Sequence, residues 1–187
     1  MTFTHIKNAF VDLDGTMLDS EGCWLEAYRL ACERSAVPVL PHILQSFGKL
    51  SFSEWSKLVA EQPGIFGELT EYAKEVYTQR LPKKAVMDIV YALPDGCKRT
   101  VITREPCDLV RHWLKHSGIT VFDEVITAGD GRMTKEFYAV PSLLLIDDNY
   151  KHCSVAKAAG ATVIGVNDHH SYEQKKLMRA VCDLYLD

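Results

Sequence analysis

Two carboxylates lie one residue apart in the segment 9–18, which reads AFVDLDGTML. The apolar residues before Asp12 predict a buried strand, and the Gly-Thr pair after Asp14 favours a tight turn. Ionised carboxylates at the end of a buried strand repel each other and lose hydration, so the pair needs a cation or a raised pKa. This spacing indicates a site that performs chemistry, with a simple acidic turn as the alternative.

Polar residues also end two later apolar runs. Thr103 ends the run 100–103, and Asp147 with Asp148 follows the continuous apolar run 143–146. Because the carboxyl ends of parallel strands share one edge of a sheet, we expect four carboxylates and a hydroxyl to meet there. Oxygen ligands favour a hard cation, and Mg²⁺ together with a substrate phosphate is the expected one.

Such a group of residues is suited to phosphoryl transfer. A carboxylate beside Mg²⁺ can attack phosphorus and form an aspartyl-phosphate. A second carboxylate two residues away can protonate the leaving group and then activate water. A hydroxyl, backbone N–H groups and a lysine would hold the phosphoryl oxygens.

The elements that must position these side chains follow an α/β pattern. Predicted strands alternate with helical patterns after residue 83, and this order predicts a doubly wound, Rossmann-like parallel sheet with helices on both faces. The sheet is expected to hold five strands, at residues 8–12, 100–103, 124–127, 143–146 and 161–166.

The stretch between the first two strands has a different character. Residues 19–82 show helical spacing of apolar residues, interrupted by prolines, and no strand pattern. We therefore expect a catalytic α/β core of residues 1–18 and 83–187, with residues 19–82 inserted as an all-helical domain.

Composition and charge exclude several classes of protein. The chain has 187 residues, 47% of them hydrophobic, and a net charge of −4, which argues against non-specific binding of nucleic acid. It contains no apolar run long enough to span a membrane and no secretory signal pattern. Its six cysteines are scattered, which favours reduced thiols and a cytoplasmic location.

The motifs FVDLDGT, VIT (101–103) and LLLIDDN, in this order and at strand ends, resemble those of the haloacid dehalogenase-superfamily phosphatases, the DxDGT hydrolases. The resemblance covers nearly the whole core and implies strand order 5-4-1-2-3. It also implies that the helical insertion is a cap that closes over the site and selects the substrate.

The resemblance assigns roles to individual residues. Asp12 would be the nucleophile and Asp14 the general acid/base. The Asp12 carboxylate, the Asp14 carbonyl and Asp148 would bind Mg²⁺, with Asp147 as a direct ligand or as support. Thr103 and the amide after it would hold phosphate.

Two further phosphate contacts are expected from basic residues. The family's motif lysine is best matched by Lys135 in GRMTKEF, with Lys115 as the second candidate. Arg104, next to Thr103, is a candidate substrate contact or a surface ion pair.

These residues predict a Mg²⁺-dependent phosphatase acting on a small phosphate ester such as a nucleotide, sugar phosphate or phospho-acid. A phosphomutase on the same scaffold and a non-catalytic phosphate-binding regulator are the alternatives. A dehalogenase is disfavoured because that branch does not need Asp14. No nucleic-acid or membrane partner is expected, and the protein is expected to be a monomer or homodimer.

Overall fold

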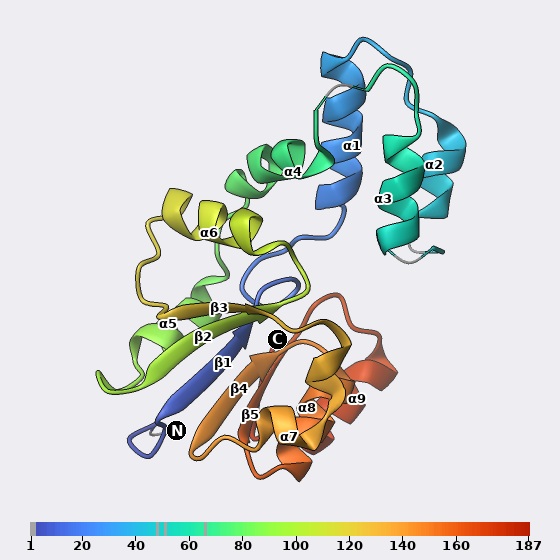
Figure 1. The fold of residues 1–187 in the computed structure, drawn as a ribbon. Helices are drawn as coiled ribbons and strands as arrows, with labels where there is room; N and C mark the ends of the chain where they lie inside the picture. Colours follow the sequence, from blue (N-terminus) through green and yellow to red (C-terminus); the bar gives the residue numbers. More distant parts are fainter. Residues whose placement is uncertain (1–2, 48, 51, 66) are drawn as a thin grey trace. The chain divides into compact units, whose positions relative to one another are not determined.

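The computed structural model describes residues 3–47, 49–50, 52–65 and 67–187 (Figure 1). The chain forms two compact units, one of Met1–Asp19 with Leu81–Asp187 and the other of Ser20–Arg80. The cap role expected for the helical insertion stays a prediction.

The larger unit contains one parallel sheet with the order β3-β2-β1-β4-β5-β6. All five predicted strands are present, and their predicted order is confirmed. Their bounds are β1 (Asn8–Asp12), β2 (Lys98–Thr103), β3 (Glu124–Thr127), β4 (Leu143–Asp147) and β5 (Thr162–Val166).

The prediction of five strands was one short, because β6 (Leu184–Leu186) adds a sixth beside β5. Three residues are too few to show a strand period in the sequence. Gly165 of β5 lets this segment pack closely, since a Cβ there would lie 2.7 Å from Cys182 Sγ and 2.9 Å from the Tyr185 ring.

Helices cover both sides of the sheet (Figure 1). On one side lie α5 (Lys84–Tyr91) and α6 (Cys107–His116). On the other lie α7 (Lys135–Tyr138), α8 (Tyr150–Ala158) and α9 (Tyr172–Val181), preceded by the short 3₁₀ helix η1 (Gly129–Met133). This is the doubly wound arrangement expected from the order of elements.

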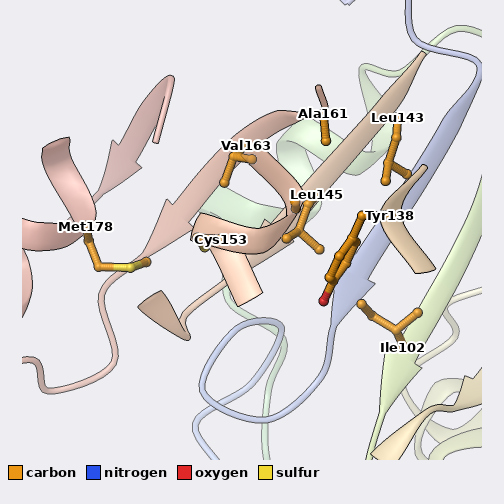
Figure 2. Close-up of a cluster of buried hydrophobic side chains, with 9 residues drawn as sticks. Ile102, Tyr138, Leu143, Leu145, Cys153, Ala161, Val163 and Met178 are labelled. Carbon is orange, nitrogen blue, oxygen red and sulfur yellow. The ribbon is translucent and has the colours of Figure 1, made fainter. Parts of the chain in front are cut away.

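One apolar cluster lies between β4, β5 and the helices beside them. Figure 2 shows Leu145 and Val163 from the two strands together with Tyr138 of α7 and Cys153 of α8. The described residues of β4 are all buried, which explains their uninterrupted apolar sequence. Because β4 is packed on both faces, the position of Asp147 at its end is well defined.

The smaller unit is built from helices, as the sequence indicates. It contains α1 (Cys23–Arg34), α2 (Pro41–Ser46), α3 (Phe52–Ala60) and α4 (Leu69–Thr78). Aromatic side chains form its core: the Trp24 and Tyr77 rings meet edge to face at 6.4 Å, as do Tyr28 and Trp55 at 6.3 Å.

Within the described part of the chain, every helix is too short or too polar to cross a bilayer.

Candidate active site

Three neighbouring strands end in polar residues at the same edge of the sheet. Asp12 ends β1, which pairs with β2 on one side and β4 on the other. Thr103 ends β2 and Asp147 ends β4. The structure therefore brings the predicted strand-end residues to one edge, where the strand order reverses direction.

The turn after Asp12 is held by its own backbone. The Leu13 carbonyl accepts hydrogen bonds from the N–H groups of residues 16, 17 and 18, at 2.8–3.3 Å. Gly15 has a φ of +73°, and a Cβ there would lie 2.5 Å from Asp168 Oδ2 and 2.9 Å from Asp148 Oδ2. Glycine is thus required both by the left-handed backbone and by the two carboxylates packed against it.

Thr16 links the first strand end to the fourth. Its hydroxyl lies 3.2 Å from Asp12 Oδ2 and 3.0 Å from Asp148 Oδ1, and it accepts the Asp148 N–H at 3.0 Å. A hydroxyl has one proton, so it can donate to only one of these carboxylates at a time. Asp12 and Asp148 are therefore held close together while they share a single hydroxyl proton from Thr16.

A buried arginine lies against the acids. Arg132 Nη2 lies 3.0 Å from Asp12 Oδ1 and 2.8 Å from Asp147 Oδ2, and the Arg132 side chain is only 3% exposed. Burial opposes its charge, but Asp12 and Asp147 outweigh burial and raise the pKa of Arg132. Its guanidinium thus serves as the internal counter-ion of the acidic cluster.

Arg132 stands where the sequence analysis expected Lys135. Arg132 lies in η1 and is buried, whereas Lys135 begins α7 and is exposed. The Thr134 hydroxyl caps α7 by accepting the Phe137 N–H, and this cap separates the two basic residues. The second candidate, Lys115, is exposed near the end of α6.

Asp147 is fully engaged by the protein. Its Oδ1 accepts the Asn149 N–H at 2.8 Å, and its Oδ2 lies 2.8 Å from Arg132 and 3.1 Å from His152 Nδ1. The His152 ring is buried and comes from the first turns of α8. Asp147 therefore has little capacity left for a further ligand.

The carboxylate of Asp148, unlike that of Asp147, is not paired with Arg132 or His152. Burial, followed by the charges of Asp147 and Asp168, raises the pKa of Asp148 to about 6. Burial and the charge of Asp147 also raise the pKa of Asp12 well above its usual range, and Arg132 only partly offsets this. Asp12 and Asp148 are thus the acids whose negative charge is least compensated.

Oxygen atoms of Asp12, Asp147 and Asp148 lie within 4.8 Å of one another and could hold a metal ion. Three carboxylates without nitrogen or sulfur donors form a hard oxygen set, which fits Mg²⁺. Because Asp147 is already bound by Arg132 and His152, Asp12 Oδ2 and Asp148, both beside Thr16, are the better candidate ligands.

The other predicted residues surround this cluster. Thr103 is buried, its hydroxyl lies 3.5 Å from Asp14 Oδ2, and it accepts the Glu105 N–H at 3.0 Å. Asp14 is half-buried, whereas Arg104 is exposed. Asp14 thus lies between the β2 end and the acidic cluster, with more access to solvent than Asp12.

Sequence reasoning missed Arg132, His152 and Asp168. Arg132 could have been found by admitting either basic residue type in the segment before β4, since both carry the required charge. His152 and Asp168 follow β4 and β5 in the sequence, but nothing in their spacing identifies a buried or acid-facing side chain.

No protein-family model matches the chain, and no curated protein matches its sequence. Its fold is nevertheless similar to several solved structures. A proposed beta-phosphoglucomutase from Thermotoga maritima superposes with a TM-score of 0.71 at 19% identity, covering 97% of this chain and 94% of that chain.

Two further structures have the same fold. A proposed haloacid dehalogenase-type hydrolase from Bacillus subtilis, bound to magnesium, has a TM-score of 0.60 at 16% identity, with 90% of this chain and 92% of that chain covered. The L-2-haloacid dehalogenase of Xanthobacter autotrophicus has a TM-score of 0.55 at 20% identity, with 90% and 80% covered. The chain has the fold of the haloacid dehalogenase superfamily.

Proposed function

We propose that this protein is a Mg²⁺-dependent phosphomonoester hydrolase that acts through an aspartyl-phosphate on Asp12. The observation that carries the proposal is the buried cluster of Asp12, Asp147 and Asp148, held by Arg132 at the carboxyl edge of the sheet. So many carboxylates at one edge are costly to fold, which is expected at a site that binds a cation and an anionic substrate.

Asp12 would attack the phosphorus atom through Oδ1. Its Oδ2 faces Thr16 and Asp148, where the metal would bind, which leaves Oδ1 beside the guanidinium of Arg132. As the new bond between Asp12 and phosphorus forms, the bond from phosphorus to the substrate oxygen breaks. Arg132 would then donate to the phosphoryl oxygens, in the role that the family resemblance gives to a lysine.

Asp14 would move the protons. In its protonated form it gives a proton to the departing substrate oxygen. It then takes a proton from the water that attacks the phosphoryl group, and this second step releases inorganic phosphate and restores Asp12. Its contact with Thr103 and its greater exposure suit a group that must meet both leaving group and water.

Asp12, Asp148 and the Asp14 carbonyl would hold Mg²⁺, whose chemistry would be to offset the charge of the acids and of the phosphate. Asp147 would act mainly by orienting Arg132, with which it forms an ion pair at 2.8 Å. Thr103 would bind phosphate through its hydroxyl, and Arg104 is a candidate substrate contact at the exposed rim.

The substrate class proposed is a small phosphorylated metabolite. A phosphomutase is the second candidate, favoured by the similarity to the proposed phosphoglucomutase, and would return the phosphoryl group to substrate instead of water. The similarity to an L-2-haloacid dehalogenase raises a third chemistry, but Asp14 and the metal-type acids favour phosphoryl transfer.

The test is hydrolysis of p-nitrophenyl phosphate and a panel of phosphorylated metabolites with Mg²⁺ or with EDTA, beside halide release from 2-chloropropionate. We expect phosphate release that needs Mg²⁺ and falls about a thousandfold or more in Asp12→Asn. Halide release without phosphate release would replace this proposal with a dehalogenase. Equal rates in Asp12→Asn and wild type would remove Asp12 as nucleophile.

A further inference from the structure

Lys83 lies where the chain returns from the helical unit to the sheet, and it reaches the turn that follows Asp14. Its Nζ donates to the Gly15 carbonyl at 2.5 Å, and its backbone N–H donates to the Met17 carbonyl at 2.6 Å. One residue thus holds this turn at two points. Hydrogen bonds from a charged donor are stronger than neutral ones, so the ammonium should contribute most of this restraint.

The same ammonium also contacts the loop after β5. Lys83 Nζ lies 3.4 Å from Asp168 Oδ1 and 3.3 Å from the Asn167 carbonyl. Lys83 and Asp168 are about one-quarter exposed, at 26% and 24%, and line a cavity of about 390 Å³. Ions from solvent can therefore reach Asp168 through this cavity.

Asp168 is close enough to the acidic cluster to affect it. Asp168 and Asp148 both pack against Gly15, and the charge of Asp168 contributes to raising the pKa of Asp148. Without a cation beside it, Asp168 would add negative charge next to the position between Asp12 and Asp148. Lys83 supplies that cation from the chain itself.

We propose that Lys83 is a positioning residue of this site: its ammonium fixes the turn that carries Asp14 and neutralises Asp168, so that Asp168 does not contribute to binding the metal. The proposal rests on the metal role given above to Asp12 and Asp148. It differs from a purely structural role because removal of Lys83 is expected to change metal affinity and turnover in opposite directions.

The test compares Lys83→Met with Lys84→Met, a matched control whose side chain is 85% exposed and pairs with Asp88. Calorimetric titration with Mg²⁺ should show about threefold to tenfold tighter binding in Lys83→Met, because Asp168 is no longer neutralised. The double variant Lys83→Met/Asp168→Asn should return to wild-type affinity. Lys84→Met should match wild type throughout.

A second readout concerns the turn itself. Amide hydrogen exchange of residues 15–18 should speed up about tenfold or more in Lys83→Met, while exchange in β4 and β5 stays unchanged. If phosphatase activity is found, kcat should fall with KM little changed, and Lys83→Arg should recover most of it. Lys83→Gln, which also removes the charge, serves if Lys83→Met does not fold.

Unchanged or weaker Mg²⁺ binding in folded Lys83→Met or Lys83→Gln would overturn the proposal. So would tighter binding that persists in the double variant, unchanged exchange of residues 15–18, or absence of Mg²⁺ binding by the wild type. Mg²⁺ binding that follows the predicted pattern without any phosphatase activity would instead refute the proposed function and leave the role of Lys83 supported.

Discussion

At the scale of single residues, Arg132 is the group on which the acidic cluster depends. It contacts Asp12, Asp147 and His152 through one nitrogen, while its Nε, within the described chain, is buried without a hydrogen-bond partner. A buried cation whose Nε–H lacks a partner is suited to donate to a phosphoryl oxygen or a water. We infer that Arg132 serves both the folded state and the ligand.

Removing the charge of Arg132 should lower the stability of the protein far more than replacing Arg132 by lysine. Arg132→Met leaves two buried carboxylates without their partner and should cost about 3–5 kcal/mol of unfolding free energy. Arg132→Lys keeps the charge and should retain most of the stability, with a loss of activity of about tenfold because the planar donor set is gone. Urea unfolding and phosphate release measure the two effects, and equal stability of both variants would contradict this role.

The second prediction at this scale concerns Asp148. Its ionised form is poorly compensated in the folded protein, so Asp148→Asn should raise the melting temperature in EDTA by a few degrees. Mg²⁺ should stabilise the wild type but not Asp148→Asn. Differential scanning calorimetry with and without Mg²⁺ measures this, with Asp88→Asn on the exposed face of α5 as a control. A lower melting temperature of Asp148→Asn in EDTA would show that Asp148 stabilises the fold.

At the scale of elements, the sequence predicts the strands that position the site. β1, β2 and β4 end in Asp12, Thr103 and Asp147, and continuous apolar runs made these strands recognisable. β6 and the pair η1–α7 were not predicted because each has only a few residues, too few to show a period. Their conformations depend on tertiary contacts, such as the close packing of Cys182 and Tyr185 on Gly165.

Some residues of the candidate site could likewise be predicted from the sequence, whereas others depend on tertiary contacts. Asp12, Asp14, Thr103, Asp147 and Asp148 could be named from motifs, since each lies within two residues of a strand end. Arg132 becomes a candidate once arginine is admitted beside lysine, but the sequence does not show the 3₁₀ turn that decides which basic residue of this segment is buried. The contacts of Lys83 with Gly15 and Asp168 join residues 68 and 85 positions apart, which no local pattern reveals.

Asp183 joins three elements at the start of β6. Its carboxylate accepts the Val163 N–H at 2.9 Å and a hydrogen bond from Lys157 of α8 at 2.5 Å. Burial alone would raise the pKa of Asp183, but these hydrogen bonds outweigh it and lower the pKa. The ionised carboxylate therefore stabilises the fold where β6 joins β5 and α8.

A pKa lowered by folding gives stability that is present above the unfolded value of about 3.9 and is lost as pH falls through the folded value. Asp183→Asn should therefore cost about 1 kcal/mol at pH 7, and this cost should shrink as pH falls below the unfolded value. Unfolding curves of both proteins at several pH values test this, with Asp187→Asn as a terminal control. A cost that grows as pH falls would contradict the assignment.

At the scale of the whole molecule, the fold places its charges where phosphoryl transfer would need them. The chain carries a net charge of −4, yet two cations, Arg132 and Lys83, lie against the acids at the edge of the sheet. Arg132 faces Asp12 and Asp147, Lys83 faces Asp168, and Asp148 between them has neither. This distribution leaves Asp12 and Asp148 as candidate ligands for a divalent cation and leaves Asp12 beside Arg132.

The most direct test of the central claim is to locate the phosphoryl group on the protein. Asp14→Asn should accumulate the phosphoenzyme when mixed with acetyl phosphate and Mg²⁺, because this donor needs no acid for its leaving group while hydrolysis lacks its base. After acid quenching, peptide mapping by mass spectrometry should place one phosphoryl group on Asp12, absent from Asp12→Asn/Asp14→Asn. A phosphoryl group on another residue, or none on a folded Asp14→Asn protein that binds Mg²⁺, would contradict the account.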